Sequence, residues 1–276
     1  MPNRLFSTLA FLVLAACASA SEPREVSGTI GNGGLLIIKG QVNTVSIRSV
    51  IDTGASHHVY DRKLMPFLDG LESGEPNAAI DICDPQHLVI GPLVDVVNAG
   101  SAVADLSPFN LKAKERIDAV IGMPFLIGRA IHVYPSRQSF AIQETAILDN
   151  KGLCIQLDES SRPCVLLTIG GKEVLALIDT GSNAEITASE VEFERILSCL
   201  TEGKKPSIVD VQTLDGVAQR RKITNCDIAI DGSLVRDVTI VESKSTKIGM
   251  AFLTRFEAVI DLLNMRLRLK TISDGQ

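Results

Sequence analysis

The sequence contains no tryptophan, two tyrosines and four histidines among its 276 residues. Its formal net charge is −6 and it has no long basic run, so it lacks the basic patch that nucleic-acid-binding proteins use. The apolar run at residues 5–16 is too short to cross a bilayer as a helix. These absences argue against a nucleic-acid partner and against this run as a membrane span.

Motifs of several enzyme classes are also missing. The chain has no His-Glu-x-x-His motif of zinc peptidases, no Gly-x-Ser-x-Gly elbow of serine hydrolases and no Cys-x-x-Cys motif. His57 and His58 are adjacent, but only His87 and His132 accompany them. We therefore expect neither a metal site nor another cofactor. We expect His57 and His58 at the edge of a cleft or in solvent.

Residues 1–20 have the organisation of a secretory signal peptide. A short basic start precedes the apolar run, and Ala18-Ser19-Ala20 offers a cleavage site. Leu14-Ala15-Ala16-Cys17 also resembles the lipobox of bacterial lipoproteins, in which the cysteine is lipidated and becomes the mature N-terminus. We favour lipidation of Cys17, with simple secretion and loss of Cys17 as the alternative. Either way, we expect an exported protein that faces the periplasm. Lipidation of Cys17 would anchor it to the membrane.

Six cysteines include Cys17 in the leader and five others. Export permits disulfides, but an odd number leaves at least one thiol outside any disulfide within the chain. Cys154 and Cys164 flank a turn that we predict at residues 158–163. If the two flanking segments pair, these cysteines could face each other across a hairpin, within disulfide range.

Two short stretches repeat at one constant shift. Residues 50–55 read Val-Ile-Asp-Thr-Gly-Ala, and residues 177–182 read Leu-Ile-Asp-Thr-Gly-Ser. The shift between their aspartates is 179 − 52 = 127, and residues 121–126 recur as 248–253 at the same shift, 249 − 122 = 127. A constant shift over most of a chain indicates internal duplication. Two copies predict two related lobes, residues 24–147 and 150–272, in one monomeric chain.

Short strands separated by turn signals dominate both copies, so the sequence predicts an all-β fold. Strands are expected within residues 26–51 and 153–178, with turns at residues 31–34, 42–44, 158–163 and 170–171. Hairpins are expected around residues 135–138 and between residues 257–261 and 266–270. One helix is predicted after Ser189, because apolar residues then fall on one helical face and Ser189 with Glu192 forms a capping box.

An apolar pair followed by Asp-Thr-Gly-Ala or Asp-Thr-Gly-Ser, with an Ile-Gly-Met-x-Phe-Leu segment at the same distance downstream in both copies, resembles the retropepsin-type aspartic peptidases. The resemblance covers nearly all of residues 26–271. It implies two pseudo-symmetric retropepsin-like β-barrel lobes, each with its Asp-Thr-Gly loop at the lobe interface. It also implies an aspartic endopeptidase that hydrolyses protein or peptide substrates, with Asp52 and Asp179 as the catalytic pair.

The same resemblance implies roles for the neighbours of the two aspartates. Thr53 and Thr180 would hydrogen-bond across the interface and fix the two loops. Gly54 and Gly181 would allow the tight loop geometry. The fourth position differs between the copies, and the hydroxyl of Ser182 could stabilise the ionised form of the aspartate in its own loop.

Peptidases of this family also cover the substrate with a β-hairpin flap. Thr213-Leu214-Asp215-Gly216 is the candidate, because Asp-Gly between extended segments favours a two-residue hairpin turn. We expect the equivalent region of the first copy at residues 83–94, which carry Pro85 and Pro92 but no such turn.

Two carboxyl groups held close together share one proton, because they repel each other strongly when both are ionised. In an aspartic peptidase the ionised partner takes a proton from water, while the protonated partner polarises the substrate carbonyl. The alternative hypothesis is a catalytically inactive retropepsin-like lipoprotein that binds extended peptides. A third hypothesis, a purely structural envelope lipoprotein, leaves the two matched acidic loops unexplained.

Overall fold

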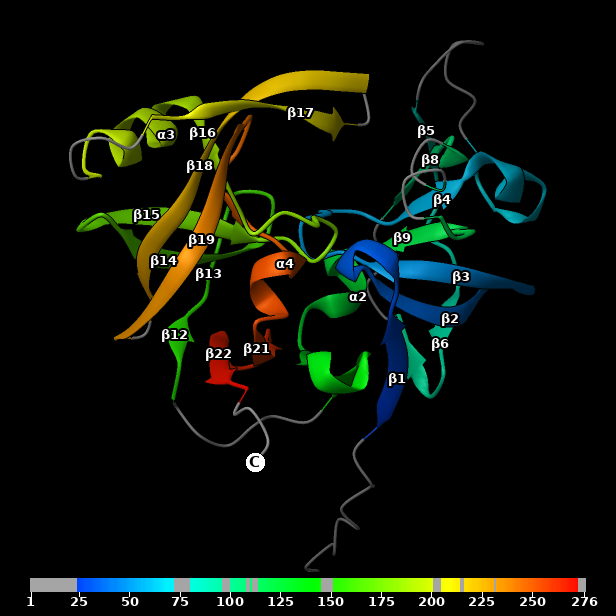
Figure 1. Ribbon diagram of the computed structural model, residues 1–276. Coiled ribbons are helices and arrows are strands. Elements are labelled where there is room, and N and C mark those ends of the chain that lie inside the picture. The colour runs from blue at the N-terminus through cyan, green and yellow to red at the C-terminus, as the bar shows by residue number, and fades with distance from the viewer. Residues whose placement is uncertain are drawn as a thin grey trace, which may run out of the picture.

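The computed structural model describes residues 24–71, 80–95, 100–107, 110, 114–144, 151–200, 205–213, 216–230 and 232–272. The predicted signal peptide at residues 1–20, with Cys17, lies outside these residues. Strands make up most of the described chain and its helices are short, so the predicted all-β class is confirmed (Figure 1).

Strands are distributed through both halves of the chain. Those of the first half are β1 (Glu25–Ile30), β2 (Leu36–Val42), β3 (Val45–Ile51), β4 (Val59–Asp61), β5 (Ile80–Cys83), β6 (Leu88–Ile90), β7 (Leu93–Val94), β8 (Ser101–Ala104), β9 (Ala119–Ile121), β10 (Ala130–Tyr134) and β11 (Ser139–Gln143). Those of the second half are β12 (Leu153–Cys154), β13 (Gln156–Leu157), β14 (Pro163–Ile169), β15 (Lys172–Ile178), β16 (Ile186–Ser189), β17 (Ser207–Thr213), β18 (Gly216–Ile230), β19 (Ser233–Ser243), β20 (Lys247–Ile248), β21 (Phe256–Asp261) and β22 (Arg266–Thr271). The helical segments are η1 (Asn32–Gly34), η2 (Arg62–Phe67), η3 (Pro135–Arg137), α2 (Met123–Leu126), α3 (Glu190–Leu197) and α4 (Met250–Leu253).

The predicted turns lie where the strand patterns break. β2 and β3 meet at a tight turn in which Asn43 has φ of 51°, and β14 and β15 meet at Gly170 and Gly171, with φ of 56° and 77°. Asparagine and above all glycine tolerate positive φ, which explains these residues at these turns. Both predicted hairpins are present, β10 with β11 and β21 with β22.

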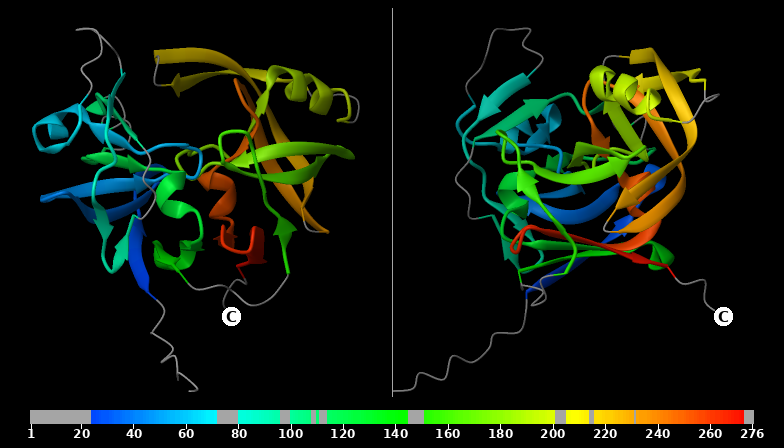
Figure 2. Two further views of the ribbon diagram at one scale, coloured as in Figure 1. Left: turned by 180° about the vertical axis from the view of Figure 1, so that it is seen from behind. Right: turned by 90° about the vertical axis from the view of Figure 1, so that its left-hand side faces the viewer.

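Six neighbouring strands join the two halves of the chain. Their order is β12-β22-β21-β10-β11-β1, so β10 of the first half pairs antiparallel with β21 of the second. Ile131 lies opposite Ile260 in this central pair, and both side chains are buried. These strands form a layer along the bottom of the molecule in the right-hand view of Figure 2.

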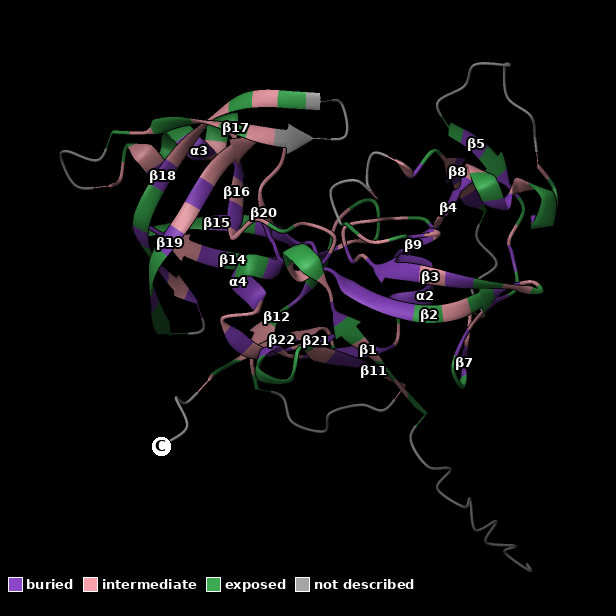
Figure 3. Cartoon of the chain, turned by 45° about the vertical axis from the view of Figure 1, so that its right-hand side comes forward, coloured by how far each residue is buried: buried purple, intermediate pink, exposed green. Residues whose placement is uncertain are grey.

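The second half contains a closed six-stranded barrel. Its strands follow the order β14-β15-β20-β16-β19-β18, and β18 pairs back onto β14 with Ile228 opposite Ile169. Buried residues alternate with exposed ones along β18 and β19 (Figure 3). This alternation places one face of each strand in the apolar core, whose removal from water is the main stabilising contribution.

The first half has a similar order of neighbours, β2-β3-β9-β4-β8 against β14-β15-β20-β16-β19. The shift between equivalent pairs is nevertheless not constant. Val42 and Ile169 are equivalent at the shift of 127. Val42 lies opposite Leu88 and Ile169 lies opposite Ile228, so the residues opposite them differ by 228 − 88 = 140. The shift is 127 again at β9 and β20, because 248 − 121 = 127. The second half is therefore longer in the region that contains the β17–β18 hairpin. The first half is longer between β8 and β9.

This uneven shift corrects the expected position of the first-half flap. Residues 83–94 contain β6 and β7, which pair with each other, and β6 also pairs with β2. They correspond to the end of β18 and the start of β19, and not to Thr213–Gly216. With the shift of 140, the residues equivalent to Thr213–Gly216 are 73–76, which lie outside the described residues. The expectation was wrong because it assumed one shift for the whole chain.

Helix α3 confirms the predicted helix. The Ser189 side chain accepts a hydrogen bond from the Glu192 backbone N–H at 3.3 Å, which caps the first turn. Phe193 and Ile196 are fully buried on the predicted apolar face. No helix in the described residues is long and apolar enough to cross a membrane.

The expected Cys154–Cys164 crosslink is wrong. Within the described residues the cysteines form no disulfide. Gln156 lies opposite Cys164 in the β13–β14 pair, whereas Cys154 lies in β12 opposite Arg266. A short interruption between β12 and β13 therefore sends the two cysteines to different strand partners.

Candidate active site

Each Asp-Thr-Gly sequence follows a strand that lies between parallel and antiparallel neighbours. The Asp52 backbone N–H donates to Ile121 O at 3.0 Å, which continues the parallel pairing of β3 with β9. The Asp179 N–H donates to Ile248 O at 2.9 Å and continues the pairing of β15 with β20. The two loops therefore leave their sheets in the same way.

The two threonines connect the loops by four hydrogen bonds. The Thr53 N–H donates to the Thr180 hydroxyl at 3.0 Å, and the Thr180 N–H donates to the Thr53 hydroxyl at 3.2 Å. The Thr53 hydroxyl donates to Ile178 O at 2.6 Å, and the Thr180 hydroxyl donates to Ile51 O at 2.8 Å. Both threonines are fully buried, so each of these bonds satisfies a group that water cannot reach.

The two glycines allow the two carboxyl groups to approach. A Cβ atom on Gly54 would lie 2.7 Å from Cγ of Asp179, and one on Gly181 would lie 2.4 Å from Oδ2 of Asp52. Neither Gly54 nor Gly181 is among the described glycines that have positive φ. Close packing of each loop against the opposite aspartate, rather than an unusual backbone angle, is therefore what requires glycine here.

The carboxyl group of each aspartate accepts a backbone hydrogen bond within its own loop. The Gly54 N–H donates to Oδ1 of Asp52 at 2.7 Å, and the Gly181 N–H donates to Oδ1 of Asp179 at 3.0 Å. Burial, the negative charge of Asp179 and a hydrogen bond between the two carboxyl groups raise the pKa of Asp52 to about 7. The Gly54 N–H and the positive charge of Lys247 oppose this rise. Asp52 is thus placed to keep a proton at near-neutral pH.

Lys247 breaks the similarity between the two loops. Its Nζ donates to Oδ2 of Asp179 at 2.6 Å, an ion pair in which the Asp179 side chain is 6% exposed. The Ser182 hydroxyl instead accepts from the Ala184 N–H at 3.4 Å. A stabilising contact to Asp179 was expected from Ser182, but in the described structure Lys247 supplies it.

A difference between the two sequence copies points to this lysine. The segment that precedes the first downstream glycine reads Val120-Ile121-Gly122, and its second copy reads Lys247-Ile248-Gly249. The second copy has a charged residue, Lys247, where the first copy has a buried valine, Val120. Such a replacement beside a carboxylate loop identifies a candidate ion pair.

Gly122 and Gly249 pack closely against the backbone that follows each Asp-Thr-Gly loop. A Cβ on Gly122 would lie 2.4 Å from His57 O, and one on Gly249 would lie 2.4 Å from Ala184 O. The Gly122 N–H donates to Nδ1 of His58 at 3.1 Å, and the other ring nitrogen of His58 contacts Asp95 at 2.7 Å. His58 therefore carries its proton on Nε2 and acts as a buried support of the first loop. It was expected at a cleft edge or in solvent, which is wrong.

A hollow of about 450 Å³ lies beside the first loop and is lined by both halves of the chain. Its lining residues are Ser56, His57, Met123, Pro124, Ile127, Glu159, Ser160 and Ser161. His57 is exposed there, in agreement with the expectation for this histidine. The hollow offers apolar surface and hydroxyl groups, and neither Asp52 nor Asp179 is among its lining residues.

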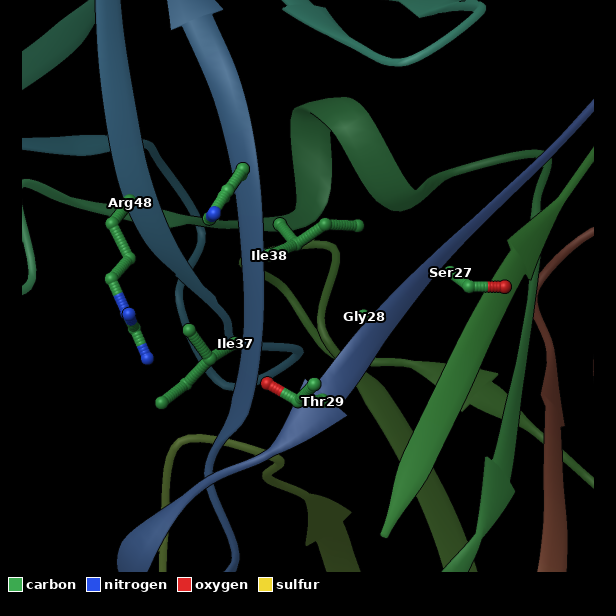
Figure 4. Close-up of a pocket in the computed structure, with 7 residues that line it drawn as sticks. Ser27, Gly28, Thr29, Ile37, Ile38 and Arg48 are labelled. Atoms are coloured by element: carbon green, nitrogen blue, oxygen red, sulfur yellow. The ribbon is translucent and has the colours of Figure 1, made fainter. Parts of the chain in front are cut away.

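A second hollow of about 350 Å³ lies between β1, β2 and β3 (Figure 4). It is lined by Ser27, Gly28, Thr29, Ile37, Ile38, Lys39 and Arg48. This lining includes two cations and no acid. None of these residues belongs to either Asp-Thr-Gly loop.

The candidate flap lies partly outside the described residues. β17 and β18 pair antiparallel over seven positions, and the last pair is Thr213 opposite Gly216. Leu214 and Asp215 lie outside the described residues. Figure 1 shows the β17–β18 ribbon extending along the top of the second half toward the half that contains β5 and β8.

In the described parts of the chain, no group of three or more His, Cys, Asp or Glu side chains is arranged to hold a metal ion. Comparison with known proteins adds nothing to the identity of the site, because no family model and no curated protein matches the chain. What the site can do follows from its geometry.

Proposed function

We propose that this protein is an aspartic endopeptidase that hydrolyses peptide bonds with the Asp52–Asp179 pair. The observation that carries the proposal is the mutual approach of two Asp-Thr-Gly loops, in which each glycine packs against the opposite carboxyl group. The four hydrogen bonds of Thr53 and Thr180 support it, since they hold both loops in one geometry.

The reaction needs one proton shared by the pair. The ionised carboxylate takes a proton from a water molecule as the water oxygen bonds to the substrate carbonyl carbon. The protonated partner gives its proton to the carbonyl oxygen, which yields a neutral tetrahedral intermediate. The first carboxyl group then protonates the leaving nitrogen, the C–N bond breaks, and the second recovers its proton from a hydroxyl of the intermediate.

The fold proposed for this function is a pair of pseudo-symmetric retropepsin-like lobes, residues 24–147 and 150–272. The matched strand orders and the equivalent places of the two loops in them support it. One chain then supplies both aspartates, so a monomer suffices for activity.

The proposed substrates are proteins or peptides in an extended conformation. The hollow of about 450 Å³ beside Ser56 and His57 would take a substrate side chain. The β17–β18 hairpin, with Thr213 to Gly216 at its end, would cover the substrate from the second half. We also propose that the protein is exported to the periplasm and anchored by a lipid on Cys17.

The alternative function is a catalytically inactive protein that binds extended peptides. The Lys247–Asp179 ion pair is the observation that favours it, because the Lys247 ammonium group engages Oδ2 of one of the two carboxyl groups at 2.6 Å. The reciprocal hydrogen bonds of Thr53 and Thr180 and the close packing of both glycines argue against it.

Digestion of a peptide library by the mature protein separates these functions. The peptidase proposal predicts cleavage that pepstatin inhibits and that Asp179→Asn abolishes. Binding of peptides without cleavage by the wild-type protein would support the alternative and exclude the peptidase.

A further inference from the structure

The hydrogen-bond donors around the two aspartates match except for one. Each Oδ1 accepts one glycine N–H, from Gly54 at 2.7 Å and from Gly181 at 3.0 Å. Among the described residues, only Asp179 also accepts from an ammonium group, that of Lys247 at 2.6 Å. The two glycine N–H donors favour ionisation of both carboxyl groups. Lys247 is therefore the hydrogen-bond donor that distinguishes Asp179 from Asp52.

The location of Lys247 in the fold explains why its effect falls on one side. Lys247 lies in β20, opposite Leu177 of β15 and Thr187 of β16. Its counterpart at the shift of the two loops is residue 247 − 127 = 120, a valine that is 8% exposed. Val120 has the same two kinds of neighbour, in β3 and β4. The first loop therefore has an apolar side chain where the second has a cation.

Lys247 faces the charges of both aspartates. Asp179 contacts it directly, and Asp52 lies within range of its field. Neither strand neighbour of Lys247, Leu177 or Thr187, is titratable. The Lys247 side chain is 29% exposed, so water screens the ion pair only in part.

We propose that Lys247 is a positioning residue that keeps Asp179 ionised and leaves the shared proton on Asp52. The catalytic roles in this inference rest on the proposed peptidase function. Asp179 then takes the proton of the attacking water, and Asp52 donates its proton to the carbonyl oxygen of the substrate. The assignment makes the pair unequal before substrate binds.

A consequence is that the single-proton state of the pair extends to lower pH. An opposite charge in contact favours the ionised form of a carboxyl group. Removal of Lys247 should therefore raise the pH at which Asp179 becomes protonated, and with it the acidic limb of the pH profile. The matched substitution is Lys247→Val, because valine occupies the equivalent strand position in the first half.

The test is a carboxyl carbon-13 NMR titration of Asp52 and Asp179, with Asp52→Asn and Asp179→Asn used to assign the signals. In the wild-type protein Asp179 should titrate at lower pH than Asp52. In Lys247→Val the Asp179 transition should move to higher pH, and the acidic limb of kcat/KM should move with it. On that limb kcat/KM should fall by about 10-fold for each unit of the shift.

Two controls accompany these measurements. Lys247→Arg keeps the cation and should leave Asp179 as the more acidic residue. Lys172→Met removes an exposed lysine at the other end of β15 and should change neither transition.

The proposal is overturned if Asp52 is the more acidic residue in the wild-type protein, a result that needs no substitution at position 247. It is also overturned if folded Lys247→Val leaves the Asp179 transition where it was. Titrations that move as expected in a protein without aspartate-dependent cleavage would instead refute the peptidase function and keep the role of Lys247 in protonation.

Discussion

Thr53 and Thr180 each donate a backbone N–H to the hydroxyl of the other, at 3.0 and 3.2 Å, although 127 residues separate them. Each hydroxyl then donates to a carbonyl of the strand that precedes the opposite loop. This reciprocal arrangement couples the two halves of the chain at the point where the two aspartates meet.

Thr53→Val should destabilise the protein by about 1–3 kcal/mol, because it keeps the shape of the side chain and leaves buried donors and acceptors unsatisfied. Thr53→Ser retains the hydroxyl and should lie close to the wild type. Urea unfolding of the three proteins measures the difference. Equal free energies of unfolding for Thr53→Val and wild type would show that these hydrogen bonds do not hold the loops.

Gly181→Ala should abolish cleavage and lower the melting temperature. Its methyl group would lie 2.4 Å from Oδ2 of Asp52, so the loops must separate. Gly100→Ala is the matched control, since a Cβ there makes an ordinary contact of 3.5 Å with Cys83 O. Thermal unfolding and a peptide-cleavage assay check both variants. A fully active Gly181→Ala protein would contradict the close approach of the two loops.

Asp52→Asn should change the pH dependence of stability. Asp52 has a pKa of about 7 in the folded protein and an ordinary value of 3.8 when unfolded. Between these values the folded state binds a proton that the unfolded state has released, so wild-type stability falls as pH rises through this window. An asparagine cannot ionise and escapes this loss.

The melting temperature of Asp52→Asn relative to wild type should therefore rise between about pH 4 and pH 7 and then level off. Asp210→Asn, at an exposed position of β17, should show no such trend. Asp179→Asn should not be stabilised in the same way, because it removes the partner of Lys247. A pH-independent difference for Asp52→Asn would mean that Asp52 is not buried beside a second carboxyl group.

The strand pattern and the sequence repeat predicted the parts of the fold that depend on local signals. The turns at Asn43 and Gly170, the capped helix after Ser189 and the two late hairpins all form where residue type and periodicity indicated. The repeat also predicted which two loops would resemble each other. These features follow from backbone preferences and apolar periodicity, which are properties of short segments.

Other features depended on contacts that the sequence does not state. The replacement of Val120 by Lys247 in the second copy marked this lysine, but a lysine side chain is long and flexible, so the sequence did not fix Asp179 as its partner. Burial of His58 depends on its contacts with Gly122 and Asp95, which are distant in sequence. The flap equivalence failed because a difference in length between the two halves changes the shift locally.

The most direct test of the account is kcat/KM for peptide cleavage by wild type, Asp52→Asn, Asp179→Asn and the double variant. Each single substitution should lower kcat/KM by about 10²–10⁴-fold, the usual loss for a general acid–base group. The double variant should be little worse than either single variant, because the two carboxyl groups act as one unit. Near-full activity in either folded single variant would contradict the proposed aspartate pair.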